Sequence, residues 1–335
     1  VEAPRTRQEM QTVVKAVGKP LAGKSTLNRP ELSPPGANEK SRYKKITAQM
    51  HKVHEFFVEA FLDQHPAPPQ RIVLDFDATD DPVHGNQLGR FFHGYYQNYC
   101  FLPLYVFCGD HPLLALLRPA DIDAATGSVK QLARIVARIR QAWPEVQIVV
   151  RGDSGFCRDE LLDWCEANRV DYVIGLAKNK RLSRILGGEL HQAQRQFEAT
   201  GEAARVFKDV EYRTHKSWSR ARRVIGKAEH LAKGANPRFV VTSLPAESYD
   251  ARTAYEDEYC ARGNMENRIK EQQLYLFADR TSCQSLRANQ LRLALSTAAY
   301  VVMRALRETG LRDTPLAHAQ VDTIRLKLFK IGAEV

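Results

Sequence analysis

A short apolar segment that ends in carboxylates constrains the fold more than any other part of the chain. Residues 71–77 read RIVLDFD, and Asp80 and Asp81 follow closely. A β-branched and apolar run bounded by turn residues is typical of a buried strand. Because side chains alternate along a strand, Asp75 and Asp77 should lie on one face, where either could bind a metal ion. The alternative is that Asp80 and Asp81 only cap a turn and that Asp75 is solvated.

A second apolar strand is predicted at residues 146–150, and it leads into the turn Arg-Gly-Asp-Ser-Gly around Asp153. The glycines on both sides of Asp153 allow the backbone to bend, so that the carboxylate projects from the end of the strand. If the two strands are neighbours in one sheet, Asp77 and Asp153 emerge close together.

The order of the predicted elements indicates a mixed α/β sheet flanked by helices. Two aromatic-rich stretches, residues 91–100 and 102–108, follow the first strand and predict an antiparallel meander with it. Further along the chain we expect helices at 43–63, 129–143 and 158–168, and a strand at 172–177. In such a sheet the first strand can pair with the fourth.

Residues 204–244 differ from the segments before them and predict a small β-rich insertion. Within them, residues 205–233 carry nine Lys or Arg against three Asp or Glu, with Phe207, Tyr212 and Trp218 interleaved. Two helices are expected after the insertion in the sequence, at residues 257–277 and 285–307. The chain as a whole has a formal net charge of +10, which favours a polyanionic partner over a neutral small molecule.

The helix expected after the insertion carries a stripe of functional side chains. Tyr259, Arg262, Glu266 and Lys270 are separated by three, four and four residues, which places them along one helical face. The alternative is an exposed helix held by Arg262–Glu266 and Glu266–Lys270 ion pairs.

Asp77, Asp153 and Glu266 together offer three hard oxygen ligands on separate elements. Such a set suits Mg²⁺ or Mn²⁺. Two such ions can activate a water or a 3′-hydroxyl and stabilise the leaving oxygen of an in-line displacement. The six cysteines form no C-x-x-C pair, so the sequence predicts no zinc knot and favours free thiols in a reducing compartment.

Neither a membrane span nor a signal peptide is predicted from the sequence. No run approaches the roughly 18 consecutive apolar residues that a membrane span needs, and the N-terminus lacks the layout of a signal peptide. We therefore expect a soluble protein of the cytoplasm that does not bind membranes.

Taken in order, these motifs resemble those of DDE-type transposases of bacterial insertion sequences, in particular the family of insertion sequence 1380. The matching pieces are Leu74–Thr79 with Val83–Gln87, Arg151–Phe156, and the Tyr259, Arg262 and Glu266 spacing. The similarity covers roughly residues 20–333. It implies an RNase H-like core, a β-rich insertion between the second Asp and the Glu, and cut-and-paste chemistry at the ends of a mobile element.

The resemblance also implies roles for individual residues. Asp77, rather than Asp75, is the first catalytic carboxylate. With Asp153 and Glu266 it would hold the metal, two Mg²⁺ or Mn²⁺ ions. Tyr259 and Arg262 would contact the DNA backbone near the cleaved phosphate. The family places a Lys seven residues after the Glu, where this chain has Gln273, and Lys270 is the expected substitute.

The expected partner is double-stranded DNA, both the terminal inverted repeats of the element and the target, bound by a homodimer in the bacterial nucleoid. Side chains of the basic insertion would bind the DNA ends through contacts with phosphates and through stacking on bases. These side chains are Trp218, Arg220, Arg222 and Arg223. Two alternatives remain at this point: a truncated, inactive relic that binds DNA without chemistry, and an RNase H-like nuclease.

The expected organisation has five parts. They are a lead-in and helix left from an upstream region (1–70), the first part of the catalytic core (71–182), the insertion (183–250), the second part of the core (251–310) and a C-terminal tail (311–335).

Overall fold

The computed structural model describes residues 48–330, and the chain divides into two compact units. The larger unit comprises residues 54–81 and 90–269, and the smaller one contains the described residues 48–53, 82–89 and 270–330. Most of the expected lead-in, residues 1–47, lies outside the described residues.

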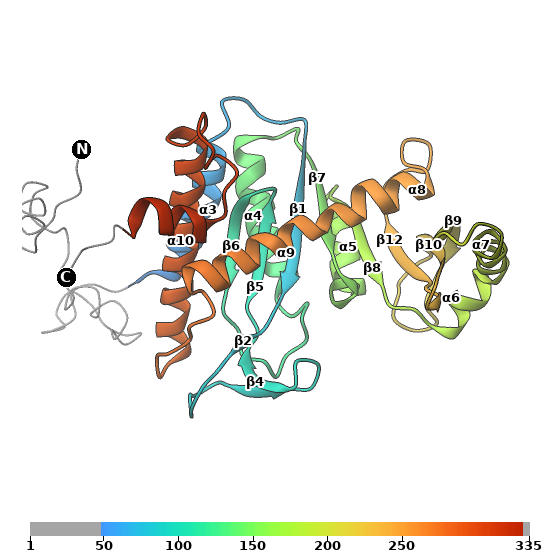
Figure 1. Cartoon of the computed structure of the whole chain (residues 1–335), viewed down its shortest axis with the longest axis horizontal. Coiled ribbons are helices and arrows are strands. Elements are labelled where there is room, and N and C mark those ends of the chain that lie inside the picture. The colour runs from blue at the N-terminus through green and yellow to red at the C-terminus, as the bar shows by residue number, and fades with distance from the viewer. Residues whose placement is uncertain (1–47, 331–335) are drawn as a thin grey trace, which may run out of the picture. The chain divides into compact units, whose positions relative to one another are not determined.

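A mixed sheet forms the centre of the larger unit (Figure 1). The strands of its core are β1 (Arg71–Ala78), β5 (Leu104–Cys108), β6 (His111–Leu116), β7 (Gln147–Gly152) and β8 (Asp171–Leu176). They lie in the order β6-β5-β1-β7-β8, with β1 antiparallel to β5 and parallel to β7, and with β7 parallel to β8. The first strand therefore pairs with the fourth, as predicted, and the order is that of the RNase H-like fold.

The predicted meander is wrong in one respect. Residues 91–100 do not join the central sheet. They form a hairpin of β3 (Phe91–His93) and β4 (Asn98–Phe101) in a second sheet, after the short strand β2 (Asp81–Pro82). The third strand of the meander is instead β6, whose Leu113, Leu114 and Ala115 are buried. Aromatic residues fit any pleated, half-buried surface, so their presence did not identify the sheet that they join.

Three helices cover one face of the central sheet: α3 (Met50–Asp63), α4 (Ser128–Ala142) and α5 (Asp159–Ala167). Their apolar side chains form one core with the alternate residues of β1, namely Ile72, Leu74 and Phe76. Because side chains alternate, Val73, Asp75 and Asp77 lie on the opposite face.

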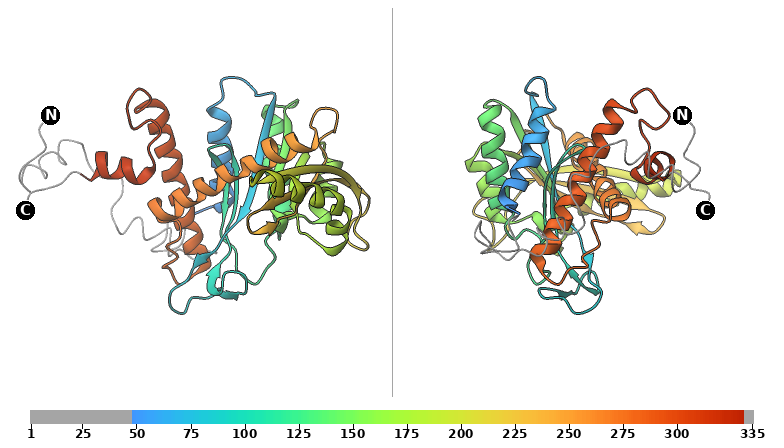
Figure 2. Two further views of the ribbon diagram at one scale, coloured as in Figure 1. Left: turned by 45° about the vertical axis from the view of Figure 1, so that its right-hand side comes forward. Right: turned by 90° about the vertical axis from the view of Figure 1, so that its left-hand side faces the viewer.

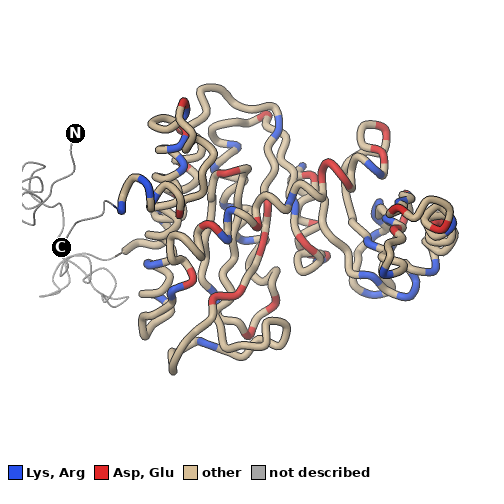
Figure 3. The backbone as a smooth tube through the Cα atoms, in the orientation of Figure 1, with Lys and Arg blue, Asp and Glu red and all other residues tan. Residues whose placement is uncertain are grey.

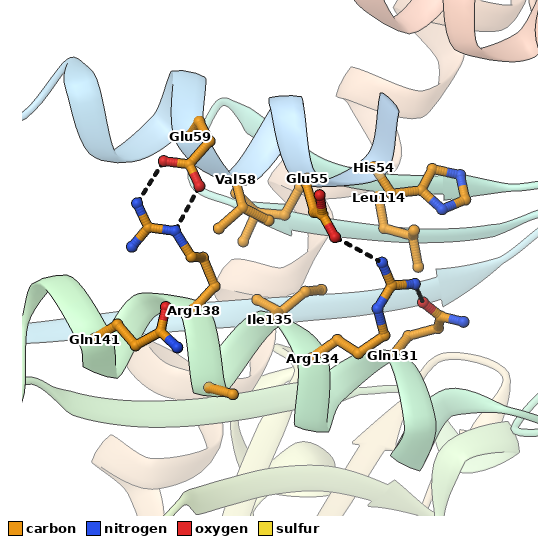
Figure 4. Close-up of a pocket in the computed structure, with 12 residues that line it drawn as sticks. His54, Glu55, Val58, Glu59, Leu114, Gln131, Arg134, Ile135, Arg138 and Gln141 are labelled. Carbon is orange, nitrogen blue, oxygen red and sulfur yellow. Dashed lines mark hydrogen bonds and ion pairs between the residues drawn. The ribbon is translucent and has the colours of Figure 1, made fainter. Parts of the chain in front are cut away.

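A pocket of about 390 Å³ lies between α3 and α4 on the first of these faces (Figure 4). Arg138 binds Glu59 at 2.5 Å and Arg134 lies 3.9 Å from Glu55, so ion pairs tie the two helices along its rim. The pocket lining includes none of the predicted catalytic carboxylates.

The opposite face of the sheet is covered by a long, irregular helical segment, seen crossing the strands in Figures 1 and 2. Its parts are α8 (Ala251–Thr253), the π-helical η2 (Ala254–Tyr259), the 3₁₀ turn η3 (Cys260–Arg262) and α9 (Gly263–Lys270). Tyr255 and Ala254 pack against Val149 and Val173 of the sheet. Changes of helix type of this kind often mark functional positions.

The predicted β-rich insertion is present and extends the central sheet, and Figure 3 shows both basic and acidic residues along its backbone. It contains α6 (Lys180–Ile185), α7 (Gly187–Thr200), β9 (Ala204–Tyr212), β10 (Arg222–Leu231), β11 (Gly234–Ala235) and β12 (Arg238–Thr242). Strand β12 pairs antiparallel with β8, and β10 pairs with β9, β11 and β12. The insertion is therefore joined to the core through backbone hydrogen bonds.

In the smaller unit, the structure describes η4 (Glu271–Tyr275), α10 (Leu286–Thr309), α11 (Val321–Ile324) and η5 (Arg325–Phe329). Met303, Leu311, Val321 and Ile324 form its apolar core. Buried Glu271 accepts hydrogen bonds from Arg307 at 2.5 Å and from the Val321 amide at 2.8 Å.

Gln87, the last residue of a motif that carried the family resemblance, has a structural role in the smaller unit. It donates to the Thr281 carbonyl and accepts from Asn289 at 3.0 Å. Within residues 48–330, no helix has both the length and the apolar character that crossing a membrane requires.

Candidate active site

Two of the predicted carboxylates stand at the ends of adjacent parallel strands. The register pairs Asp75 with Arg151 and Phe76 with Gly152. Asp77 follows Phe76 on β1, and Asp153 follows Gly152 at the end of β7. The two neighbouring strands therefore place these residues side by side at one end of the sheet. The phosphate chemistry predicted from the sequence requires this proximity.

Asp75 and Asp77 lie on the same face of β1 but have different surroundings. Both carboxylate oxygens of Asp75 accept hydrogen bonds from Arg151, at 2.5 and 2.8 Å. Asp75 is 3% exposed, so the alternative of a solvated Asp75 is wrong. Burial raises the pKa of Asp75, and the Arg151 guanidinium opposes that rise. The oxygens of Asp75 are thus already satisfied, which leaves Asp77 as the available ligand on β1.

Asp153 caps the short 3₁₀ helix η1 (Ser154–Phe156). One of its oxygens, Oδ1, accepts a hydrogen bond from the Gly155 amide at 2.8 Å. This bond fixes the side chain at the mouth of the turn. Neither flanking glycine has a positive φ, so the structure does not support the predicted role of the glycines in bending the backbone. Close packing explains them instead, because a Cβ atom at Gly155 would lie 2.9 Å from Asp153 Oδ1 and one at Gly152 would lie 3.2 Å from Phe156 Cβ.

Arg262 connects the helical segment to the carboxylate on β1. Its guanidinium donates to Glu266 Oε1 at 2.7 Å, and another of its nitrogens lies 3.8 Å from Asp77 Oδ1. The Arg262–Glu266 pair of the alternative interpretation is therefore present, but the same arginine also reaches the sheet. Asp77 and Glu266 both face Arg262, and Asp153 acts electrostatically on Arg262 as well.

The negative charges around Asp77 repel one another. Burial raises the pKa of Asp77 to about 7. Arg262 opposes this rise, whereas Asp153 and Glu266 add to it. Carboxylates gathered in this way favour a cation, and an all-oxygen set fits Mg²⁺ or Mn²⁺. In the described part of the chain, however, no group of three His, Cys, Asp or Glu side chains is placed so that it could hold a metal ion.

Gly175 on β8 is a site residue that the sequence analysis missed. A Cβ atom there would lie 2.6 Å from the Tyr259 hydroxyl and 2.9 Å from the Ser154 amide nitrogen. The bare backbone therefore allows Tyr259 to reach the turn that carries Asp153. A glycine inside an apolar strand often indicates such a close approach, and this signal was available in the sequence.

The structure places Arg222 and Trp218 in the interior of the protein. The Arg222 side chain is 2% exposed and binds Asp159 at 2.7 Å, Asp163 at 2.5 Å and Glu166 at 2.9 Å. Trp218 is 5% exposed and packs in the core of the larger unit. These contacts hold the insertion on α5, so the placement of neither residue supports the predicted role in DNA binding.

The other predicted DNA-binding residues differ from one another in exposure. Arg223 binds Asp209 at 2.6 Å and two backbone carbonyls. Arg220 is largely exposed but pairs with Glu166 at 2.6 Å. Lys270 is exposed at the end of α9, and Gln273 is half-buried in η4.

Comparisons with known proteins identify the family to which the chain is similar. A family model for transposase DDE domains of group 1 matches residues 3–335. No curated protein matches the chain. Among solved structures, the chain is similar to a piggyBac transposase in a synaptic complex with hairpin DNA, determined by cryo-EM. The identity is 10%, the TM-score is 0.44, and the match covers 78% of this chain. The chain spans about half, 52%, of the length of that transposase chain.

Proposed function

The chain belongs to the family of group 1 transposase DDE domains, and from this we propose that it catalyses metal-dependent cleavage and strand transfer at the ends of a mobile element. The reaction would be cut-and-paste transposition of a bacterial insertion sequence resembling insertion sequence 1380. The observation that carries the proposal is that Arg262 binds Glu266 and lies 3.8 Å from Asp77, on the strand next to the one that leads into Asp153.

In this proposal Asp77, Asp153 and Glu266 hold divalent ions, Mg²⁺ or Mn²⁺. When bound, a pair of such ions supplies an activated water or 3′-hydroxyl and stabilises the leaving oxygen. Backbone amides orient two of these carboxylates: the Gly155 amide donates to Asp153 at 2.8 Å, and the Ala78 amide donates to Asp77 at 3.0 Å. Arg151 keeps Asp75 from competing as a ligand.

Arg262 and Tyr259 are proposed to bind the phosphate that is cleaved. A guanidinium matches the geometry of phosphate oxygens through paired hydrogen bonds. Arg262 already lies beside Asp77, so a phosphate that it binds would sit next to the metal ligands. Lys270 is kept as a further phosphate contact on the basis of its sequence position alone.

The proposed partners are the terminal inverted repeats and target DNA, bound by a homodimer that brings two ends together. The family membership supports DNA as the substrate. The net charge of +10 supports it as well, because Lys and Arg release counterions from DNA on binding.

A strand-transfer assay with the full chain tests the proposal. Supercoiled plasmid and a labelled oligonucleotide with a free 3′-hydroxyl are incubated with Mn²⁺, and nicking and joining are measured separately. We expect Asp77→Asn, Asp153→Asn and Glu266→Gln each to abolish both reactions without changing thermal unfolding. The exposed Asp121→Asn serves as the matched control.

Each outcome leads to a different conclusion. Metal-dependent cleavage retained by Asp153→Asn would refute the site. Nicking without joining would support an RNase H-like nuclease. DNA binding without any metal-dependent reaction would support the inactive relic.

A further inference from the structure

One buried arginine fastens the helical segment that carries Tyr259, Arg262 and Glu266 to the central sheet. Arg151 on β7 donates from Nη1 to the backbone carbonyl of Glu258 at 2.5 Å. Glu258 lies near the end of the π-helical η2 and directly precedes Tyr259. The contact therefore fixes the backbone of the segment at the point where its proposed functional residues begin.

The same guanidinium also binds β1. Its Nε and Nη2 atoms donate to the two carboxylate oxygens of Asp75, at 2.5 and 2.8 Å, while Nη1 is directed at the helical segment. Arg151 stands opposite Asp75 in the sheet, two residues before Asp153, and Asp75 stands two residues before Asp77. One side chain thus links the three elements that carry the proposed metal ligands.

Burial distinguishes this contact from the other ion pairs of the segment. The Arg151 side chain is 9% exposed, and a buried guanidinium is stable only when its N–H groups have acceptors. Arg71 binds the Glu258 carboxylate and Arg268 binds Asp110, and both of these arginines are more exposed, at 26% and 30%. Solvent screens such pairs, so the contact through Arg151 is the least screened of the three.

The geometry requires more of Arg151 than the neutralisation of a buried carboxylate. A single positive charge would neutralise Asp75, and a lysine could supply it. Holding a carboxylate and a backbone carbonyl at the same time requires a planar fork with several N–H donors, which among side chains is the property of arginine.

We propose that Arg151 is a positioning residue: by holding the Glu258 carbonyl, it sets where the helical segment lies relative to β1 and β7. A displacement of about 1 Å in an active site can reduce the rate about 100-fold, so the placement of Arg262 and Glu266 depends on this contact. The meaning of that placement for catalysis rests on the proposed function, whereas the anchoring of the segment does not.

Hydrogen exchange followed by mass spectrometry tests the anchoring on the full chain, without DNA or metal. The decisive variant is Asp75→Leu/Arg151→Met, because apolar residues of similar volume can replace a buried ion pair with little loss of stability. We expect the amides of residues 258–266 to exchange about tenfold faster than in the unchanged protein. The amides of β1 and β7 should exchange at their former rates.

Asp75→Asn is the matched control. It removes the ion pair but keeps the guanidinium, whose Nη1 atom still reaches the Glu258 carbonyl. This variant should unfold at a lower urea concentration than the double variant, yet residues 258–266 should exchange as in the unchanged protein.

Arg151→Lys is a second variant, in case the double variant does not fold. Its ammonium group can remain on Asp75 but lacks the second arm that reaches the carbonyl. The same faster exchange in residues 258–266 is therefore expected.

DNA cleavage in saturating Mn²⁺ tests the consequence for the active site. The double variant should keep its stability and lose about 100-fold in cleavage rate. Asp75→Asn should instead lose stability and keep most of its cleavage rate. A role of Arg151 in stability alone predicts the opposite ranking of the two variants.

Two results would overturn the inference: unchanged exchange in residues 258–266 when Arg151 is replaced, or normal cleavage by the folded double variant. The exchange measurement separates this inference from the proposed function. If the unchanged protein cleaves no DNA but the exchange differs as expected, the anchoring by Arg151 stands and the transposase proposal falls.

Discussion

Arg151 binds both carboxylate oxygens of Asp75, at 2.5 and 2.8 Å, from the position directly opposite on the neighbouring strand. Two residues further on, Asp77 has no such partner on β7 and faces Arg262 instead. Two acidic residues on the same face of β1 therefore differ in role. Asp75 stabilises the pairing of β1 with β7, and Asp77 is available for chemistry.

The first prediction follows from this difference. Arg151→Ala should lower the free energy of unfolding by about 3–5 kcal/mol, because it leaves the buried Asp75 charge without its partner. Asp77→Asn should leave that free energy unchanged or raise it slightly, because it removes repulsion from Asp153 and Glu266. Urea unfolding measures both. Equal destabilisation by the two variants would contradict the division of roles.

The second prediction concerns the contact between the insertion and α5. Arg222→Met should destabilise the chain by several kcal/mol, because Asp159, Asp163 and Glu166 lose a shared buried partner. Arg220→Met should cost less than about 1 kcal/mol, because Arg220 is an exposed residue of the same segment. Thermal unfolding distinguishes the two. A strong loss of DNA affinity in an intact, stable Arg222→Met protein would restore the role in DNA binding predicted from the sequence.

The sequence predicted the strand order because that order depends on local patterns. An apolar run gives β1 and another gives β7, and rules on connections then favour their parallel pairing. The wrong placement of residues 91–100 shows the limit of this reasoning. Those residues carry the aromatic side chains that favour strands, whereas residues 111–116 contain no β-branched residue. Their place in the central sheet follows from the burial of Leu113 and Leu114 in the core.

Contacts between distant segments could not be predicted from the sequence. The charge of the insertion was evident from counting, but Arg222 finds its partners about 60 residues earlier, on α5. Asp75 and Arg151 are 76 residues apart in the chain. Local spacing did not indicate that Arg222 and Arg151 form buried ion pairs. The role of Arg222 and the choice between Asp75 and Asp77 could therefore be decided only from the structure.

The third prediction tests the close approach at Gly175. Gly175→Ala should reduce DNA cleavage strongly, because the new methyl group would push Tyr259 and the turn of Asp153 apart. Overpacking of this kind also costs about 1–3 kcal/mol of stability. Tyr259→Phe in the same chain should recover part of that stability, since it removes the nearest atom. Gly188→Ala is the control, because nothing lies near its Cβ position, and normal cleavage by Gly175→Ala would refute the expectation.

The fourth prediction is a pH dependence of stability. Burial disfavours the charge of Glu229, but hydrogen bonds from Lys227, Arg205 and Asn236 outweigh it and lower the pKa to about 2. The ionised form is therefore favoured by folding. Its contribution, at most about 3 kcal/mol, is complete above the ordinary pKa of 4.5 and is lost as the pH falls towards 2.

Urea unfolding between pH 5 and about 3 measures this effect. The unchanged protein should lose stability as the pH falls, and Glu229→Gln should show a shallower fall from a lower starting value. The exposed Glu202→Gln should follow the unchanged protein. Parallel curves for all three proteins would show that Glu229 does not contribute.

The last prediction concerns Arg262, which occupies the space between two proposed metal ligands. Its positive charge lies 2.7 Å from Glu266 and 3.8 Å from Asp77, so it competes with any cation for the same oxygens. Arg262→Gln should therefore bind Mn²⁺ about tenfold more tightly in calorimetry, although it should cleave DNA more slowly because a phosphate contact is lost. Arg268→Gln removes an arginine from the same helix that pairs instead with Asp110 at 2.6 Å, and it should leave Mn²⁺ affinity unchanged. Weaker Mn²⁺ binding by Arg262→Gln would mean that the arginine positions the carboxylates for metal rather than competing with it.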